Sequence, residues 1–175
     1  RNQETALGNL MADILCDSLG IDLMLMGSGA IRSYELGPVV HYQDLVECLP
    51  YDEAVYMLQV NGTQLERMLR RILREEAFEG EHTEFYQFSH GMQIIWSRGQ
   101  QEFETLTLNG KALDQQKLYT IALSKFHYMN IQNFLNISLE EIKINAPPRV
   151  LATSYRDIVE EYMMMNPHLS SEVEG

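Results

Sequence analysis

A glycine-rich stretch followed by an arginine is the first part of the sequence whose residue types could do chemistry. The segment MLMGSGAIRS, residues 24–33, sets two glycines and Arg32 directly after an apolar, strand-like run. The Walker phosphate loop needs Lys and Ser or Thr behind its last glycine, and the dinucleotide loop needs a glycine where this chain has Arg32, so both motifs are excluded. Two interpretations stay open: a plain turn after a strand, or a turn that brings backbone amides and Arg32 to a ligand.

Side chains for metal binding or nucleophilic catalysis are present, but not in the spacings that such sites use. The histidines form no HxH, HExxH or DxH pattern, and the serines have no GxSxG elbow. The paired acids at 140–141 and 160–161 are typical of solvated helix faces. Cys16 and Cys48 are interpreted as small buried side chains, with a disulfide as the alternative. We therefore predict no metal site and no catalytic residue within the chain.

Length and charge exclude several classes of partner. At 175 residues the chain suffices for one well-buried domain, and its 45% hydrophobic and 22% charged content is ordinary for a globular protein. No apolar run approaches the roughly 20 residues that span a bilayer, so membrane insertion is not expected. The net charge of −12 would repel a polyanion, so no nucleic-acid partner is predicted. A small anionic ligand remains compatible with a few converging arginines.

The elements that must position these residues follow from hydrophobic periodicity and capping signals. Helices and strands mix without a strict strand–helix alternation, which predicts an α+β fold. Between residues 85 and 126 the period is two, which indicates sheet, and the chain around 146–148 is expected to be extended. The other elements expected are a helix from residue 4 that Gly20 ends, strands over 21–27, 39–42 and 54–60, a helix over 43–49, a helix capped by Thr63 and Glu66, and a last helix capped by Ser154 and Asp157.

The ordered set of motifs resembles the C-terminal domain of the 5'-nucleotidase family, which also includes UDP-sugar hydrolases and 2',3'-cyclic phosphodiesterases. The resemblance covers roughly residues 1 to 135 and lies in the helix LGNL.AD, the glycine loop that ends in IR, and the corner of Leu-Pro-aromatic. The segments that carry it are ETALGNLMADIL (4–15), GSGAIR (27–32), VVHYQDLVECLPY (39–51), VYMLQVNGTQLERML (55–69), LTLNGKALDQQKLYTIALSKF (106–126) and NF (133–134).

The resemblance implies a layered sandwich of mixed sheets flanked by helices, with one domain over residues 1–168 and a polar tail over 169–175. In the family, an N-terminal metallophosphoesterase domain holds two divalent metal ions and cleaves a phosphate ester. The C-terminal domain binds the nucleoside part of the substrate, and a rotation between domains brings it to the metals. The chain starts at Arg1 without an initiator Met, so we expect a piece of a longer enzyme that lacks that N-terminal domain and hydrolyses nothing by itself.

Carried over by position, the resemblance implies a substrate site built from two arginines, two aromatic rings and the glycine loop. Arg32 and Arg1 would contact substrate oxygens, because the guanidinium fork suits anionic groups. Tyr51 and Phe126 would hold a nucleobase between their faces. The remaining expected substrate-binding residues are Gly27, Ser28, Gly29 and Gln132.

Two departures from the family pattern leave the ligand open. Gly27 stands where the loop commonly has Asn, and NIQN (130–133) replaces GGDG, so Gln132 takes the place of the Asp that holds ribose hydroxyls. Nucleoside or nucleotide is the expected small-molecule partner, together with the protein's own N-terminal domain. The alternatives are a non-catalytic binding or structural module, and a metallophosphoesterase relative with another substrate, as in the thiosulfohydrolase branch that shares the fold. The sequence indicates no particular localisation.

Overall fold

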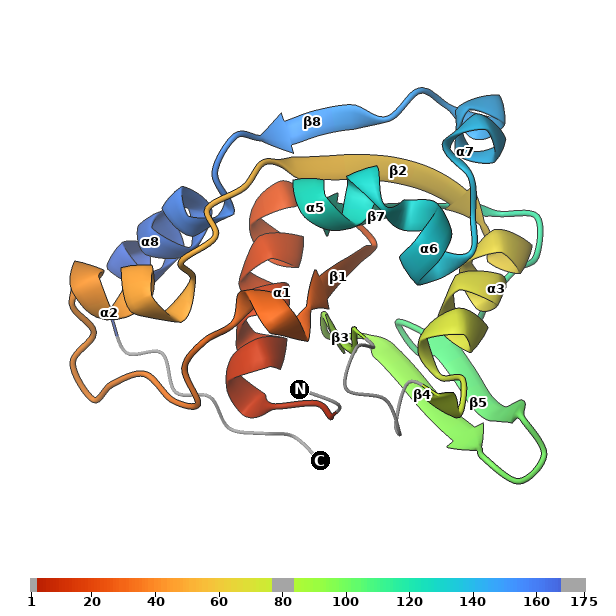
Figure 1. The fold of residues 1–175 in the computed structure, drawn as a ribbon, viewed down its shortest axis with the longest axis horizontal. Coiled ribbons are helices and arrows are strands. Elements are labelled where there is room, and N and C mark those ends of the chain that lie inside the picture. Colours follow the sequence, from red (N-terminus) through yellow and green to blue (C-terminus); the bar gives the residue numbers. More distant parts are fainter. Residues whose placement is uncertain (1–2, 77–83, 168–175) are drawn as a thin grey trace.

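The computed structural model describes residues 3–76 and 84–167, and its centre is a five-stranded mixed sheet (Figure 1). The strand order is β3-β1-β7-β2-β8, in which β1 and β7 run parallel and the other neighbours run antiparallel. A second sheet, β4-β5-β6, is antiparallel. The strands are β1 (Leu23–Gly27), β2 (Val55–Asn61), β3 (Tyr86–Phe88), β4 (Met92–Ser97), β5 (Glu102–Leu108), β6 (Lys111–Ala112), β7 (Leu118–Ser124) and β8 (Arg149–Ala152).

The inner strands of the central sheet are buried on both faces, whereas the edge strand β8 is partly exposed. Successive side chains of a strand point to opposite faces, and β1 divides its apolar residues accordingly: Leu23 and Leu25 enter one core, Met24 and Met26 the other. Its near-continuous apolar sequence is typical of a strand that is covered on both sides. The helices that provide the cover are α1 (Ala6–Leu19), α2 (Tyr42–Cys48), α3 (Gly62–Ile72), α5 (Lys125–Met129), α6 (Ile131–Leu135), α7 (Leu139–Asn145) and α8 (Tyr155–Met165), with a short 3-10 turn η1 (Ser28–Ala30) after β1.

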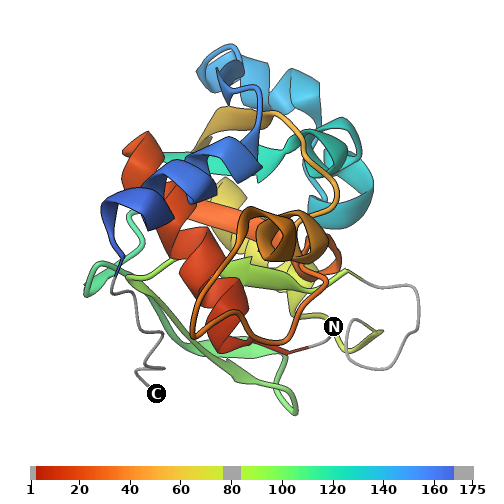
Figure 2. The ribbon, with the colours of Figure 1, turned by 90° about the vertical axis from the view of Figure 1, so that its left-hand side faces the viewer.

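One face of the sheet is covered by α1, α2 and α8. Met11 and Leu15 of α1, Leu45 of α2 and Val159 of α8 are buried in the same core. Figure 2, which views the molecule from this side, shows α1 in red and α8 in blue packed against each other, and the two helices are in contact. Helix α1 begins at the N-cap Thr5, whose side chain accepts a hydrogen bond from the Gly8 amide, and ends at Gly20 in the left-handed conformation.

The opposite face is covered by α3, α6, α7 and the second sheet, seen at the right of Figure 1. Leu65 and Met68 of α3 are fully buried there, together with Leu135 of α6 and Ile142 of α7. Two layers of helices and a second sheet thus enclose one mixed sheet. The predicted α+β fold, a layered sandwich of mixed sheets flanked by helices, is confirmed.

Most predicted elements are present, and three local predictions are wrong. Residues 39–42 form no strand, because α2 begins at Tyr42 and the amide of its N-cap residue His41 donates a hydrogen bond to Asp44 Oδ2 at 2.7 Å. The cap of α3 is not Thr63 with Glu66 but Asn61 with Gln64, two residues earlier. The strand predicted to run to Phe126 ends at Ser124, and α5 begins at Lys125.

Two further local predictions, the cap of α8 and the burial of both cysteines, agree with the structure. Ser154 caps α8 as expected, and Cys16 and Cys48 are buried free thiols. No helix among residues 3–76 and 84–167 is long and apolar enough to cross a bilayer. The domain limits 1–168 and the tail 169–175 stay a prediction, and the tail lies outside the described residues.

The corrected cap of α3 makes a prediction about stability. Asn61→Ala removes the acceptor of the Gln64 amide, which is 2.9 Å from Asn61 Oδ1, and should lower the free energy of unfolding by about 1 kcal/mol. Thr63→Ala, the matched control, removes only exposed contacts to Gln115 and should cost less. Urea unfolding of both variants measures the difference. Equal losses would contradict the assignment of Asn61 as the cap.

Candidate functional site

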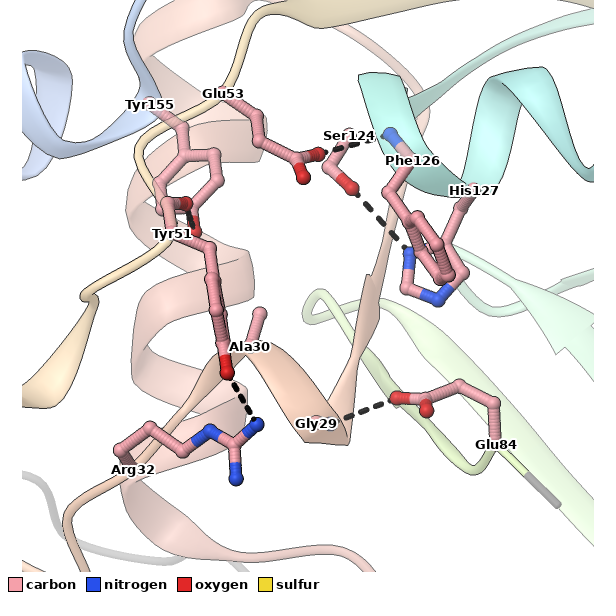
Figure 3. A pocket seen from close by; sticks show the side chains of 10 residues that line it. All are labelled: Gly29, Ala30, Arg32, Tyr51, Glu53, Glu84, Ser124, Phe126, His127 and Tyr155. Carbon is pink, nitrogen blue, oxygen red and sulfur yellow. Dashed lines mark hydrogen bonds between the residues drawn. The ribbon is translucent and has the colours of Figure 1, made fainter. Parts of the chain in front are cut away.

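A pocket of about 290 Å³ opens at one edge of the central sheet (Figure 3). The parallel strands β1 and β7 both end at this edge, and the antiparallel β2 starts there, with Val55 paired to Ser124. Ligand sites of mixed α/β sheets commonly lie at the carboxyl ends of parallel strands, because the chain leaves the sheet there in loops. The pocket is lined by Gly29, Ala30, Arg32, Tyr51, Glu53, Glu84, Ser124, Phe126, His127 and Tyr155.

Two aromatic rings line the pocket while remaining open to solvent. Tyr51, just after α2, is 52% exposed, and Phe126, in the first turn of α5, is 51% exposed. Figure 3 shows them on opposite sides of the pocket. The Phe126 ring rests against His127 and Phe134, with ring centres 5.3 and 5.7 Å apart, so its position is supported from behind. Exposed aromatic surface that is fixed in this way is available to a ligand.

Arg32 lies beside Tyr51 at the mouth of the pocket. Its Nη2 donates a hydrogen bond to Tyr51 Oη at 2.9 Å, and its guanidinium carbon lies 5.1 Å from the centre of the tyrosine ring. The Arg32 amide donates to the Cys48 carbonyl at 2.8 Å, which ties the glycine loop to the end of α2. The side chain is exposed, so donors remain for an anionic group.

The backbone amides of the glycine loop are used within the protein. The Ser28 amide donates to the Phe85 carbonyl at 2.8 Å, the Gly29 amide to Glu84 Oε1 at 2.7 Å, and the Ile31 amide to the Ser28 carbonyl. These groups therefore have partners before any ligand arrives. The turn places Arg32 at the mouth of the pocket, while the amides of Ser28, Gly29 and Ile31 already have partners within the protein. A contact between Arg32 and a ligand stays a prediction.

Gly27 is needed for space rather than for backbone conformation. Its φ of −61° is open to any residue. A Cβ atom at this position, however, would lie 2.6 Å from His127 Nε2 and 2.8 Å from Glu84 Oε1, far inside contact distance. The imidazole of His127 thus occupies the volume that a side chain at residue 27 would fill.

The structure brings together only part of the predicted site. Gly29, Arg32, Tyr51 and Phe126 line one pocket. Gly27 lies behind it, against His127. Ser28 is buried, and its hydroxyl accepts a hydrogen bond from Gln87 Nε2 at 2.6 Å. Gln132 is exposed on α6 and does not line the pocket, and Arg1 lies outside the described residues.

His127 is a pocket residue that the sequence did not single out. It is only 4% exposed, its Nδ1 lies 3.3 Å from Ser124 Oγ, and its Nε2 has no hydrogen-bond partner among the described residues. Burial lowers the pKa of its imidazole from 6.5 to about 4, so the ring is neutral at pH 7. In the sequence, the distance of His127 from the other histidines could only argue against a metal site. Its burial could not be predicted, because it depends on tertiary packing.

Glu53 and Tyr155 complete the wall between Tyr51 and Phe126, and neither was predicted. Glu53 Oε2 accepts a hydrogen bond from the Phe126 amide at 2.8 Å. The Tyr155 hydroxyl donates to the Tyr51 carbonyl, and burial raises the pKa of this phenol, with the carboxylates of Glu53 and Asp52 adding to the effect. The only sequence signal for Glu53 was its place in the segment LPYDE, and the spacing of the two acidic residues there does not indicate a pocket.

A larger hollow of about 690 Å³ lies elsewhere, between residues 34–42, the start of α1 and the end of α8. Most of its lining is apolar, and it contains none of the predicted site residues. The smaller pocket is the better candidate, because it combines exposed aromatic rings, an arginine and carboxylates at the ends of the central strands.

The fold and the pocket define a mixed-sheet domain with an aromatic-lined site at the ends of its parallel strands. Among known families, residues 1–138 match the model of the 5'-nucleotidase, C-terminal domain. The match covers most of the chain, which therefore belongs to this family. No curated protein matches the chain in sequence.

Solved structures share the fold at low sequence identity. The chain matches a 5'-nucleotidase precursor from Thermus thermophilus with a TM-score of 0.74 and 17% identity, over 97% of this chain and 34% of that one. It matches the NAD nucleotidase of Haemophilus influenzae with a TM-score of 0.71 and 13% identity, over 96% and 31%. It also matches a sulfate thiohydrolase from Thermus thermophilus with a TM-score of 0.63 and 13% identity, over 93% of this chain and 30% of that one. The chain spans about a third of each.

The buried imidazole predicts how stability depends on pH. Between pH 6.5 and about 4, the unfolded chain takes up a proton at His127 that the folded protein does not. The free energy of unfolding should therefore fall as the pH falls through this interval, by up to about 3 kcal/mol at about 1.4 kcal/mol per pH unit. Urea unfolding of His127→Phe should show a smaller loss, and the imidazole NMR signals should titrate near pH 4.

The exposed His90 provides the control for this measurement. Its side chain is 55% exposed, so His90→Gln removes no buried imidazole and should not reduce the loss of stability in acid. An imidazole of His127 that titrates above pH 6 would contradict its burial.

The packing of Gly27 against His127 makes a second prediction. Gly27→Ala should lower the free energy of unfolding by about 1–3 kcal/mol, because the His127 ring is held by Tyr86 and Phe134 and cannot retreat. Gly99→Ala, where an added Cβ meets nothing within 4 Å, should change it by less than about 0.5 kcal/mol. The cost at Gly27 should shrink in a His127→Ala background. An equal cost in both backgrounds would rule out the clash.

Proposed function

We propose that this chain is the substrate-binding domain of a two-domain, metal-dependent 5'-nucleotidase-like hydrolase, and that its pocket holds the nucleoside part of a nucleotide. The observation that carries the proposal is the pair of half-exposed rings, Tyr51 and Phe126, on opposite sides of one pocket beside Arg32. Family membership and the names of the matched nucleotidases agree with it.

The chemistry of the pocket suits a nucleotide. Aromatic faces stack with any nucleobase, at about 1–3 kcal/mol per base. Arg32 at the mouth offers a planar fork of donors, which fits phosphate or sugar oxygens better than a lysine would. The volume of about 290 Å³ lies at the lower end for ligand pockets, which suits a ring system whose polar remainder projects out.

Hydrolysis would belong to a part of the protein that this chain does not include. Among the described residues, no group of three or more His, Cys, Asp or Glu side chains converges as the ligands of a metal would. The metal ions of the family do not fit these residues, and we assign the two divalent ions to an N-terminal metallophosphoesterase domain. The role left to this chain is to hold and present the substrate.

Gln132 and Gly27 limit which residues could recognise the ligand. Gln132 lies outside the pocket lining, so a contact to ribose hydroxyls would require α6 to move toward the ligand. Gly27 carries no side chain, and His127 fills its place. Recognition would therefore rest on Arg32, Tyr51 and Phe126, with Arg1 as a further candidate. A metallophosphoesterase relative with another substrate, or a non-catalytic module, is the alternative.

Calorimetric titration with nucleoside monophosphates tests the proposal. The chain should bind them, and Phe126→Ala should weaken binding by about 5- to 150-fold because one stacking face is lost. Arg32→Ala should weaken the binding of nucleotides more than that of nucleosides, because the group that Arg32 would contact is the anionic phosphate. The controls are Tyr34→Ala and Arg149→Ala, two exposed side chains away from the pocket, which should leave affinity unchanged.

Two outcomes would contradict the proposal. Unchanged affinity in both Arg32→Ala and Phe126→Ala would show that the ligand binds elsewhere, and no binding of any nucleotide would favour the alternatives. In the longer protein, a chelator should abolish hydrolysis while leaving nucleotide binding to this domain intact, because the described residues hold no metal-ligand group.

A further inference from the structure

We propose that the pocket selects guanine, and that Glu53 is the residue that sets this preference. The inference rests on the proposed function, because it assumes that a nucleobase enters between Tyr51 and Phe126. It goes further by naming the base and the side chain that reads it.

Glu53 is held in place by hydrogen bonds from two helices, α8 and α5. Its carbonyl accepts a hydrogen bond from the Tyr155 amide at 3.0 Å, and the carbonyl of the next residue, Ala54, accepts one from the Lys125 amide at 2.8 Å. Its Oε2 accepts a hydrogen bond from the Phe126 amide at 2.8 Å. The half-buried carboxylate is therefore fixed at the pocket wall before a ligand arrives.

One oxygen of this carboxylate faces the pocket without a protein partner. Within residues 3–76 and 84–167, the hydrogen bond of Glu53 engages Oε2, and Oε1 has none. Figure 3 shows the carboxylate above the space between the Tyr51 ring and the Phe126 ring. A flat ring held between these two faces would meet the carboxylate with its edge.

A carboxylate only accepts hydrogen bonds, so it discriminates between base edges. Guanine presents two adjacent donors, N1–H and the 2-amino group. One pairs with Oε1 and the other with Oε2, which accepts it beside the hydrogen bond from the Phe126 amide, because a carboxylate oxygen has two lone pairs. Adenine and cytosine present one amino group beside a ring nitrogen that is itself an acceptor, and uracil presents one N–H between two carbonyl groups. Only guanine therefore satisfies the carboxylate twice without setting an acceptor against it.

The positions of Glu53 and Arg32 in the pocket agree with a guanine whose N1 edge faces Glu53. In a purine, the edge that carries N1 lies across the ring system from the nitrogen that bears the sugar. Figure 3 shows Glu53 and Arg32 at opposite ends of the pocket, with Tyr51 between them. A guanine that faces Glu53 would thus direct its ribose and phosphate toward Arg32, which has donors for anionic oxygens.

The carboxylate also has a purely structural role, since it caps the first turn of α5, and the test must separate the two. The Glu53→Gln variant keeps a carbonyl oxygen for the Phe126 amide but replaces the other acceptor with a donor. The matched control is Glu104→Gln, which removes the same charge from an exposed position on β5.

The experiment compares GMP, IMP and AMP by calorimetric titration of the unmodified chain, because IMP differs from GMP only by lacking the 2-amino group. We expect GMP to bind about tenfold to a hundredfold more tightly than IMP and AMP, as for a bidentate contact to one base. Glu53→Gln should bring GMP and IMP to within about threefold of each other, and Glu104→Gln should keep the preference. Thermal unfolding of both variants shows whether each is folded.

The outcomes separate this inference from the function on which it rests. If the three nucleotides bind equally well, or if folded Glu53→Gln keeps the preference for GMP, Glu53 does not select the base and the proposed nucleotide site stands. If none of them binds, the proposed function fails and the inference fails with it. The comparison of GMP with IMP on the unmodified chain decides the base preference even if Glu53→Gln does not fold.

Discussion

Burial of the inner strands of the central sheet on both faces is the constraint on which the rest of the structure depends. With Leu23 and Leu25 in one core and Met24 and Met26 in the other, neither face of β1 has room for a ligand. Polar groups buried there would lose hydration without gaining partners. Binding chemistry is thus confined to the ends of the strands, where the parallel pair β1 and β7 delivers the glycine loop and α5 to one edge.

The start of α5 is where packing and the candidate site meet. The pairing of β7 with β2 ends at Ser124 and Val55, and from there the chain turns into a helix whose Phe126 amide is capped by Glu53. The turn sends His127 inward against Gly27 and leaves Phe126 at the surface. Neighbouring residues thus have opposite roles: the neutral imidazole fills the floor, and the phenyl ring offers a face.

The sequence predicted the large elements because their signals are local. Helix α1 and strands β1 and β2 are long enough for apolar periodicity to show, and Ser154 caps α8 with an acid in the expected place. The cap of α3 was misplaced because two overlapping boxes were available. The chosen one is set by the point where β2 stops pairing, at Asn61 opposite Leu118. Helices α5 and α6, of five residues each, are too short to show a period.

The residues of the candidate site also fall into those that the sequence could predict and those that it could not. Arg32, Tyr51 and Phe126 were reached through the family resemblance, which carries positions but not environments. Glu53, His127 and Glu84 were not, because they join the pocket only when segments far apart in the sequence meet, as Glu53 meets Phe126. Conversely, Gln132 has the expected position in the sequence, but α6 leaves it exposed and away from the pocket lining.

The distribution of charge in the molecule bears on how a nucleotide would be oriented in the pocket. A net charge of −12 works against any anionic ligand at long range, although salt screens much of that repulsion beyond about 10 Å. Inside the pocket, the carboxylates of Glu53 and Glu84 disfavour a phosphate, and Arg32 at the mouth favours one. A nucleotide would therefore enter with its base inward and its phosphate outward. That orientation leaves the phosphate accessible to a catalytic domain, which a pocket that enclosed the phosphate would not allow.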